Sequence, residues 1–443
     1  MKKILYFSTA MLLWVGCETR NNNVQNTTEE TTPETFVANY DEAQIPEYEL
    51  PALLIDENGN QINSVAEWEE NRKPWIFQQF ANQVYGQLPG EYDTLIFEVV
   101  QEVPNTLDGK ATAKEVKIYF SKEKQQHYSM DLLIYLPKEI TSAVPVFLGL
   151  NFYGNQTISS DTFITINKSW VRNNEDFGVI DNQATEKSRG ARVNRWPLEM
   201  IIDAGYGLAT IYYGDLDPDK DNPVDWQDGI HPLFYREGQV KPDSNQFAAI
   251  GAWAWGLSRA VDYLATDQDI NEDKIALIGH SRLGKAALWA GATDSRFNIV
   301  ISNNSGCGGA ALSRRSYGET VGRINNAFPH WFCQNFHQYN NNESELPVDQ
   351  HMLLALIAPR PLYVASAEDD QWADPKGEFL AAKHASKAYE LYGKDGLSGN
   401  EMPAVNQPLQ NGSVAYHIRT GKHDVTDYDW EQYLKFAKQQ WQD

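Results

Sequence analysis

A serine between two glycines is the feature of this chain whose residue types best fit a chemical reaction. The segment 274–289 has the sequence KIALIGHSRLGKAALW, in which Gly279, Ser281 and Gly284 separate two apolar runs. Small residues around a serine, between a buried strand and a helix, are typical of a nucleophile elbow, because larger side chains would collide in so tight a turn. The turn exposes the serine hydroxyl beside the free N–H groups that begin a helix, which can stabilise an oxyanion. We therefore predict that Ser281 attacks a carbonyl, although its second glycine lies three residues after the serine and not two.

A nucleophilic serine needs a base, and the base needs an acid that orients it. In α/β-hydrolases the two follow the serine in the order acid, then histidine. His423 lies in the loop 420–426, directly after the last strand that the sequence indicates. His280 is adjacent to Ser281, but in an elbow its side chain would point elsewhere. We therefore predict His423 as the base.

The acid is predicted at the end of a late strand, where hydrolases of this fold commonly place it. The strand expected at 361–367 is followed directly by Glu368, Asp369 and Asp370. Asp370 has the usual position of the acid, and Glu368 is the alternative. One of these three carboxylates is expected to orient His423, and the others would be solvated or would lie at a helix N-terminus.

The elements that must position these residues alternate along the chain. A helical N-terminal wrap is expected within 40–90, an irregular insertion at 155–200 and an apolar helix at 247–264. The alternation indicates one α/β domain of the α/β-hydrolase fold, with a mostly parallel sheet covered by helices on both faces. The strands are expected at 115–120, 130–136, 144–150, 206–213, 275–278, 299–302, 361–367 and 414–419.

The N-terminus has the pattern of an export signal. Lys2 and Lys3 precede an apolar segment at 4–15 that is too short to span a membrane, and Cys17 follows a small residue. This order resembles a bacterial lipoprotein signal. Residues 1–17 are therefore predicted to be a signal peptide and Cys17 the site of a lipid anchor, with an ordinary signal peptide cut nearby as the alternative.

The composition of the rest of the chain argues against binding to nucleic acid or to the surface of a membrane. Residues 18–40 are polar and are expected to form a disordered tether, which leaves 41–443 as a single catalytic domain. The net charge of −23, from 37 basic and 60 acidic residues, argues against nucleic acid and anionic membranes as partners. We expect an exported monomer in the periplasm or on the outer-membrane surface, in contact with the membrane only through the lipid and without a cofactor.

Two further groups of residues have open interpretations. Four aspartates alternate over residues 215–221 and could suggest Ca²⁺, but the loop lacks the glycine and the terminal glutamate of an EF-hand. A solvated acidic loop is favoured there, and no metal is expected. Cys307 and Cys333 could form a disulfide in an exported protein, and the sequence does not decide whether they pair.

Short segments around and beyond the elbow carry a distinctive combination of residues. The elbow continues as Ser281-Arg-x-Gly-Lys, a tail that general esterases lack, and further segments are 305–311 (SGCGGAA), 329–333 (PHWFC), 358–361 (APRP) and 372–375 (WADP). With these marks the chain, over about residues 45–440, resembles the glucuronoyl esterases of carbohydrate esterase family 15, and its bacterial more than its fungal members. The resemblance implies hydrolysis of esters that join glucuronic or 4-O-methyl-glucuronic acid on xylan to alcohols of lignin. The expected partner is thus a glucuronoxylan or lignin–carbohydrate ester.

The resemblance also implies a role for each matching residue. Ser281 would be the nucleophile and His423 the base, and Arg282 would help to hold the oxyanion through its backbone N–H and its guanidinium. Lys285, one helical turn beyond the serine, would reach sugar hydroxyls, unless it is a solvent-facing charge. Trp372 would offer its ring and its indole N–H to the uronate, unless it only packs a loop.

One position departs from the fungal pattern. Fungal members place a catalytic glutamate where this chain has Asn304, preceded by Asn303. Either activity is lost or the acid lies in the 368–370 loop. Glu319 and Arg323 are candidate sugar contacts only. The alternatives to a glucuronoyl esterase are an acetylxylan or other carbohydrate esterase on the same fold and, less favoured, a non-catalytic glycan-binding protein.

Overall fold

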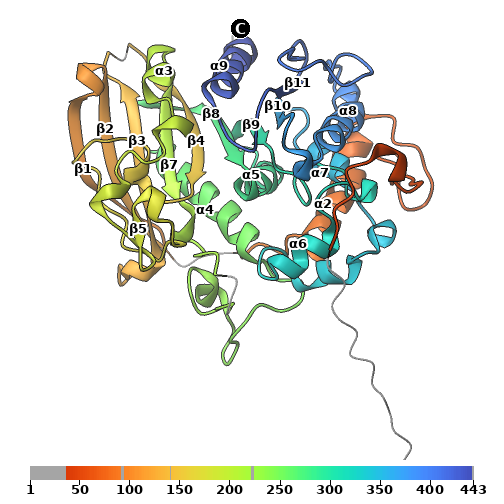
Figure 1. Ribbon diagram of the computed structural model, residues 1–443, viewed down its shortest axis with the longest axis horizontal. Helices are drawn as coiled ribbons and strands as arrows, with labels where there is room; N and C mark the ends of the chain where they lie inside the picture. The colour runs from red at the N-terminus through yellow and green to blue at the C-terminus, as the bar shows by residue number, and fades with distance from the viewer. Residues whose placement is uncertain (1–35, 91–93, 140, 221–223, 442–443) are drawn as a thin grey trace, which may run out of the picture. The chain divides into compact units, whose positions relative to one another are not determined.

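A nine-stranded sheet runs through the computed structural model of this protein, which describes residues 36–90, 94–139, 141–220 and 224–441 (Figure 1). Strand β3 is antiparallel to both of its neighbours, β2 and β7, whereas the strands from β7 through β4 to β11 are all parallel. The mostly parallel α/β sheet predicted from the sequence is therefore confirmed. In spatial order the strands are β1 (Ile96–Thr106), β2 (Ala111–Tyr119), β3 (Ser129–Pro137), β7 (Gly207–Tyr212), β4 (Val144–Asn151), β8 (Ile270–His280), β9 (Phe297–Asn303), β10 (Leu362–Ala367) and β11 (Val414–Arg419).

Helices cover the sheet on both faces because successive side chains of a strand point to opposite sides. On β3, Leu132 and Ile134 belong to one buried cluster, with residues of α4, α5 and α8, while Leu133 and Tyr135 belong to the other, with residues of α3 and α9. Strands buried on both faces are almost continuously apolar, which is why the sequence indicated them. The α-helices are α1 (Val65–Glu67), α2 (Lys73–Gln83), α3 (Leu198–Asp203), α4 (Ala249–Leu264), α5 (Arg282–Thr293), α6 (Val321–Ala327), α7 (Gln350–Ala355), α8 (Pro375–Leu391) and α9 (Asp427–Trp441).

Strand β1 was missed by the sequence reading. It is an edge strand, paired only with β2 in the sheet order. Most of its residues are exposed or half-buried, and Glu98, Gln101 and Glu102 interrupt its apolar residues. A polar edge strand discourages pairing with other chains, but it also lacks the apolar signal of an inner strand.

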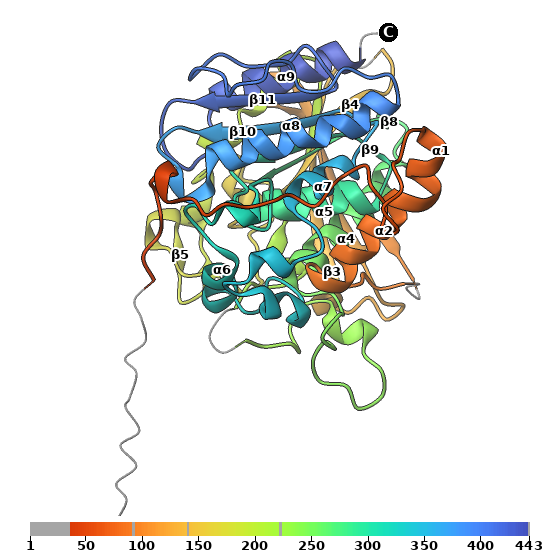
Figure 2. The ribbon, with the colours of Figure 1, turned by 90° about the vertical axis from the view of Figure 1, so that its right-hand side faces the viewer.

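The predicted N-terminal wrap is helical only in its second half. Residues 38–64 contain one short 3₁₀ turn, Glu42–Gln44, and a tight turn closed by a bridge between Ile55 and Gln61. Between these two turns the chain follows an extended path over α7 (Figure 2). The carbonyl of Pro51 lies 3.0 Å from Nε2 of His351 in α7. From α1 to α2 the chain then buries Trp68 and Phe80. The apolar residues that suggested a helix thus lie in this second half, and the prediction extended it too far toward the N-terminus.

The insertion at 155–200 has little regular structure, as expected. It contains 3₁₀ turns, the two-residue strands β5 (Val179–Ile180) and β6 (Gln183–Ala184), and the start of α3. Many of its backbone polar groups are satisfied by local turns, and the buried Gln156 ties the segment together through the carbonyl of Tyr153 and the hydroxyl of Ser188. Its link to the sheet includes the backbone N–H of Thr165, which donates to Glu115 of β2 at 2.8 Å. The predicted signal peptide 1–17, with Cys17, lies outside the described residues, and the tether 18–40 is described only from residue 36.

The prediction of a solvated acidic loop after β7 is wrong for the residues that the structure describes. Asp217 and Asp219 are buried, with 4% and 0% of their surface exposed. Their partners come from distant parts of the chain: Asp217 contacts Nε2 of His231 at 3.1 Å, and Asp219 contacts Arg282. Asp221 lies outside the described residues.

Cys307 and Cys333 do not form a disulfide. Both are free and buried thiols. The sulfur of Cys333 faces the carbonyl of Asn82 at 3.8 Å, whereas Cys307 interacts electrostatically with Lys285 and Glu319. The two side chains therefore point into different surroundings, and burial raises the pKa of both thiols.

Candidate active site

The turn between β8 and α5 has the geometry of a nucleophile elbow. Ser281 has φ 58° and ψ −129°, a left-handed conformation that side chains other than glycine rarely adopt. A Cβ on Gly279 would lie 2.1 Å from the carbonyl oxygen of Leu283. A Cβ on Gly284 would lie 2.9 Å from Cβ of Ser305 and 3.1 Å from the carbonyl oxygen of Gly279. The two glycines therefore allow the ends of the turn to touch, which explains the unusual spacing of the second one.

His423 and Asp370 meet beside this elbow. Nδ1 of His423 lies 2.6 Å from Oδ2 of Asp370, and the same oxygen accepts a hydrogen bond from Nδ2 of Asn304 at 2.8 Å. Burial would raise the pKa of Asp370, but the hydrogen bond and charge of His423 and the hydrogen bond of Asn304 bring it below its ordinary value. Asp370 is therefore ionised at neutral pH and holds Nδ1 of the histidine.

Glu368 has a different place at the end of β10. Its backbone N–H donates to the carbonyl of Arg419, and its own carbonyl accepts from the side chain of Gln371. Both contacts fix the turn that follows the strand. The carboxylate bound to Nδ1 of His423 is that of Asp370.

The residue at the fungal glutamate position supports this arrangement. Asn304 is buried, has φ 47°, and donates its backbone N–H to Ala365 in β10 at 2.7 Å. Its side chain points at the acid that the neighbouring strand supplies. At the position where the resemblance implies a glutamate in fungal members, this chain thus has an amide that donates a hydrogen bond to Asp370.

The proteins to which this chain is similar are esterases, in agreement with the nucleophile elbow and the contact between His423 and Asp370. A family model described as fungal glucuronyl esterase matches residues 209–393. A carbohydrate esterase, MZ0003, from an unknown prokaryotic organism is 51% identical over 399 residues, which is 90% of this chain and 91% of that protein. The chain belongs to carbohydrate esterase family 15. The family resemblance predicted from the elbow and its neighbouring segments is confirmed, and this protein is a carboxylic ester hydrolase of the glucuronoyl esterase family.

Solved structures of the same family share the fold. A glucuronoyl esterase from Solibacter usitatus is 49% identical, with a TM-score of 0.85 over 90% of this chain and 100% of that one. A family 15 glucuronoyl esterase from Teredinibacter turnerae is 34% identical, with a TM-score of 0.77 over 93% and 94% of the two chains. A fungal relative, 4-O-methyl-glucuronoyl methylesterase 1 of Wolfiporia cocos, is 34% identical over 212 residues, 45% of this chain and 51% of its own.

The other side of this family 15 site is formed by residues of α5 and of the loops beyond β9 and β10. Lys285 is buried, and its Nζ donates to the carbonyl of Ser305 at 2.5 Å, so it is not a solvent-facing charge. Burial lowers its pKa, and Glu319 acts in the opposite direction. The side chain of Trp372 is hydrogen-bonded to the carboxylate of Glu319, whose pKa is raised by burial. Lys285, Glu319 and Trp372 therefore form one cluster, and Arg323 lies exposed at its edge.

Next to His423, a second histidine, His280, joins a buried polar network. The rings of His280 and His423 have centroids 4.5 Å apart. Nδ1 of His280 lies 2.6 Å from Oδ1 of Asn303, whose amide donates to Asp429 at 3.1 Å and to the hydroxyl of Tyr433 at 2.8 Å. Since the amide of Asn303 is used as donor, its oxygen accepts from Nδ1–H of His280. Burial also lowers the pKa of His280 well below its ordinary value, so this histidine is neutral.

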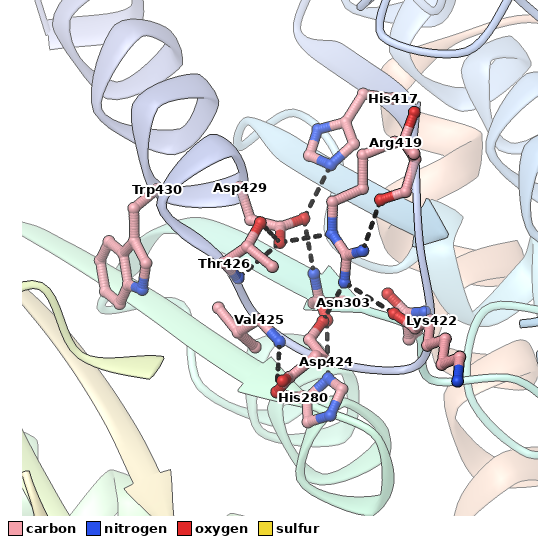
Figure 3. Close-up of polar contacts among 12 residues, drawn as sticks. His280, Asn303, His417, Arg419, Lys422, Asp424, Val425, Thr426, Asp429 and Trp430 are labelled. Carbon is pink, nitrogen blue, oxygen red and sulfur yellow. Dashed lines mark hydrogen bonds and ion pairs between the residues drawn. The ribbon is translucent and has the colours of Figure 1, made fainter. Parts of the chain in front are cut away.

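The loop that carries His423 is held by one arginine (Figure 3). Arg419, at the end of β11, donates to the carbonyls of Thr420 at 3.1 Å, Lys422 at 3.1 Å and Asp424 at 2.5 Å. Its Nε donates to Oδ2 of Asp429 at 2.7 Å. The loop is thus tied on both sides of His423 to the first turn of α9.

We expect Asp429→Asn to lower the free energy of unfolding by about 3–5 kcal/mol, because it leaves the buried Arg419 without its anionic partner. Asp429 also contacts Nε2 of His417 at 3.0 Å and accepts the backbone N–H of Thr426 at 2.8 Å. Urea unfolding followed by tryptophan fluorescence measures the change. Asp427→Asn is the control, since Asp427 is exposed on the same helical turn. An equal loss in the two variants would contradict the importance of the buried pair.

Sequence reasoning named the residues of the site that lie near an elbow, a strand end or a family segment. It missed Asp219, Asn303, Arg419 and Asp429 as supporting residues, and only their charge or amide groups next to strand ends could have hinted at them. In the described part of the chain, no group of three or more His, Cys, Asp and Glu side chains is arranged to hold a metal ion. No helix among the same residues is long and apolar enough to cross a membrane.

Proposed function

We propose that this protein hydrolyses esters of glucuronic or 4-O-methyl-glucuronic acid on xylan, with Ser281 as nucleophile, His423 as base and Asp370 as the acid that orients it. The observation that carries the proposal is a cluster in which Lys285, one helical turn beyond the elbow, meets Glu319 and Trp372 from two other loops. An acetyl group needs no such set of polar and aromatic partners. A uronate ring offers hydroxyls to the charged groups and a face to the indole.

The reaction takes two acyl-transfer steps. Nε2 of His423 accepts the proton of the Ser281 hydroxyl as Oγ attacks the uronate carbonyl, while ionised Asp370 stabilises the imidazolium that forms. The tetrahedral intermediate collapses, the ester bond breaks, and His423 gives its proton to the leaving alcohol. Water then attacks the acyl-serine by the same route, and the uronic acid leaves.

The negative charge of each intermediate is held by donors at the start of α5. The backbone N–H of Arg282 is one of the first free donors of that helix, and its guanidinium supplies a fixed positive charge next to the serine. The guanidinium lies over the ring of Trp331, 4.8 Å from its centroid. A half-buried cation stabilises a developing oxyanion more than it stabilises the neutral ester, so Arg282 acts mainly on kcat.

The names of relatives support the substrate class. Several fungal relatives are named 4-O-methyl-glucuronoyl methylesterases, and a solved bacterial relative is described as a promiscuous family 15 esterase. The second description makes an acetyl or other carbohydrate ester the competing substrate. A non-catalytic glycan-binding protein is less favoured, because the carboxylate of Asp370 contacts both His423 and Asn304 and can serve as the acid.

The test compares two esters on two proteins. Wild type is expected to hydrolyse benzyl glucuronate with the higher kcat/KM and 4-nitrophenyl acetate with the lower. We expect Lys285→Gln to lower kcat/KM on benzyl glucuronate by about 10- to 100-fold, because a charged hydrogen bond to the sugar is lost, and to leave the acetate within about threefold. The acetate reaction thereby controls for folding. Equal losses on both esters would contradict a sugar-binding role, and activity on the acetate alone would overturn the uronate assignment.

We also propose that residues 1–17 are a lipoprotein signal and that the mature protein is an exported monomer anchored through Cys17. The apolar segment that ends at a small residue and a cysteine supports this. Cys17→Ser is expected to move the protein from the membrane fraction to the soluble fraction of a producing bacterial cell, because serine cannot carry the thioether-linked lipid. Thr19→Ser is the control. An unchanged distribution would contradict the anchor.

A further inference from the structure

A single buried carboxylate, that of Asp219, binds four side chains from three parts of the chain. Its Oδ2 contacts Nη1 of Arg282 and accepts from the hydroxyl of Tyr213 at 3.0 Å. Its Oδ1 accepts from Nε2 of His330 at 2.8 Å and from Nε1 of Trp331 at 2.6 Å. The side chain is 0% exposed. Four donors on two oxygens fix both the place and the plane of the carboxylate.

The pair of Asp219 and Arg282 is charged. Burial would raise the pKa of Asp219, but the charge of Arg282 and the hydrogen bond of His330 hold it well below its ordinary value. Burial would lower the pKa of Arg282, and Asp219 raises it above its ordinary value. A buried pair of this kind contributes little net stability compared with apolar residues of the same size, so its presence beside the nucleophile needs a further reason.

The guanidinium of Arg282 is held at one end and enclosed on its faces. Besides Trp331, the rings of Phe152 and Phe328 lie 5.7 Å and 5.8 Å from its central carbon. Trp331 has two functions, since its ring covers the guanidinium and its indole N–H holds Asp219. Among the described residues, Nε of Arg282 is buried and has no hydrogen-bond partner. The planar cation is thus fixed in orientation while part of its donor set is unused.

We propose that Asp219 is a positioning residue that holds the Arg282 guanidinium toward the oxyanion of Ser281. This inference rests on the proposed function, because it requires Arg282 to stabilise that oxyanion. An arginine side chain has many rotamers, and a donor that must reorient as charge develops contributes less than one already in place. Asp219 touches no reacting atom, so its effect on the reaction passes through Arg282.

The test is a double-mutant cycle with Asp219→Asn and Arg282→Ala, measured as kcat and KM on benzyl glucuronate. Arg282→Ala is expected to lower kcat by about 100-fold. Asp219→Asn alone is expected to lower kcat by about 10- to 100-fold, with KM within about threefold, because the donor is displaced and not removed. On the Arg282→Ala background, Asp219→Asn is expected to lower kcat by less than about twofold, since the residue through which it acts is gone.

Asp349→Asn is the matched control. Asp349 is also 0% exposed and contacts a buried arginine, with Oδ2 3.3 Å from Nη1 of Arg314. Any loss of kcat in this variant is expected to be the same with and without Arg282, which is the behaviour of a merely structural residue. If Asp219→Asn fails to fold, Tyr213→Phe removes one hydroxyl from the same carboxylate oxygen and enters the cycle in its place. Its smaller loss of kcat is again expected to vanish on the Arg282→Ala background.

The outcomes separate the two proposals. If Arg282→Ala is impaired and the second substitution lowers kcat by the same factor with and without Arg282, the positioning role of Asp219 is overturned while the esterase mechanism stands. If Arg282→Ala keeps kcat within about threefold of wild type, the oxyanion role of Arg282 fails, and the role of Asp219 fails with it.

Discussion

Ser281→Ala is expected to lower kcat on benzyl glucuronate by about 10⁵- to 10⁶-fold, because no other group can form the acyl intermediate. The neighbouring hydroxyl-bearing residue of the glycine segment, Ser305, is buried and engaged by Ser302 and Ala310, at 2.7 Å and 2.8 Å. The fold should be unaffected, since alanine and serine meet the same backbone strain at φ 58°. Steady-state rates and circular dichroism of the two proteins measure both effects.

Covalent labelling adds an independent measure of the same prediction. An aryl phosphonate that carries a uronate group is expected to modify wild type at one peptide, the one that contains Ser281, and to leave Ser281→Ala unmodified. Ser316→Ala is the control, since Ser316 lies outside the elbow in the 313–316 turn. Residual hydrolysis by Ser281→Ala above about 1% of wild type would show that the reaction does not need this nucleophile.

The sequence predicted well where local pattern and burial agree. The run from Ile275 to Ile278 is apolar because β8 is buried on both faces, and the glycines on either side of Ser281 are required by the close contact of the turn with itself. His423 was found for a similar reason, because it follows β11 with only three residues between. Ser281 and His423 each lie directly beyond a strand whose apolar pattern can be recognised in the sequence.

Residues whose partners are far away in the chain could not be interpreted in the same way. Asp219 belongs to a run of alternating aspartates that looks solvated, yet its partners Arg282, His330 and Trp331 are 63, 111 and 112 residues away. Asp429 likewise meets Asn303 across 126 residues. A charge is buried only when such partners surround it, and that condition is created by the tertiary fold.

The sequence favoured Asp370 over Glu368 by its position but could not decide between them. The two residues are two apart at the end of one strand, where a period of two gives them the same side and no means of telling them apart. The chain leaves β10 at Ala367 and turns, so that Asp370 donates its N–H back to the carbonyl of Ala367 at 3.1 Å. That turn carries the carboxylate of Asp370 to His423 and Asn304.

Asp370→Asn is expected to lower kcat by about 10⁴-fold, because the amide can donate to His423 and stabilise the wrong tautomer, and because no anion then stabilises the imidazolium. Glu368→Gln is the matched control, an equally isosteric loss of charge two residues away, and is expected to keep kcat within about threefold. A collapse of Glu368→Gln with an active Asp370→Asn would reverse the assignment of the acid. Rates on benzyl glucuronate and thermal unfolding of both variants decide between the two.

The double variant Asp370→Asn with Asn304→Asp tests whether the acid can also act from residue 304. Nδ2 of Asn304 and Nδ1 of His423 both contact Oδ2 of Asp370, at 2.8 Å and 2.6 Å, so the two side chains approach the same point from neighbouring strands. In this variant an aspartate at 304 accepts a hydrogen bond from the asparagine at 370. It restores the negative charge beside His423 at the position where the resemblance implies a glutamate in fungal members. We expect kcat to recover by about tenfold or more relative to Asp370→Asn, whereas Asn304→Asp alone should impair the enzyme by placing two carboxylates in contact. If kcat does not recover, the acid can act only from the loop after β10. A carboxylate at residue 304, after β9, would then also need changes in the loop of His423.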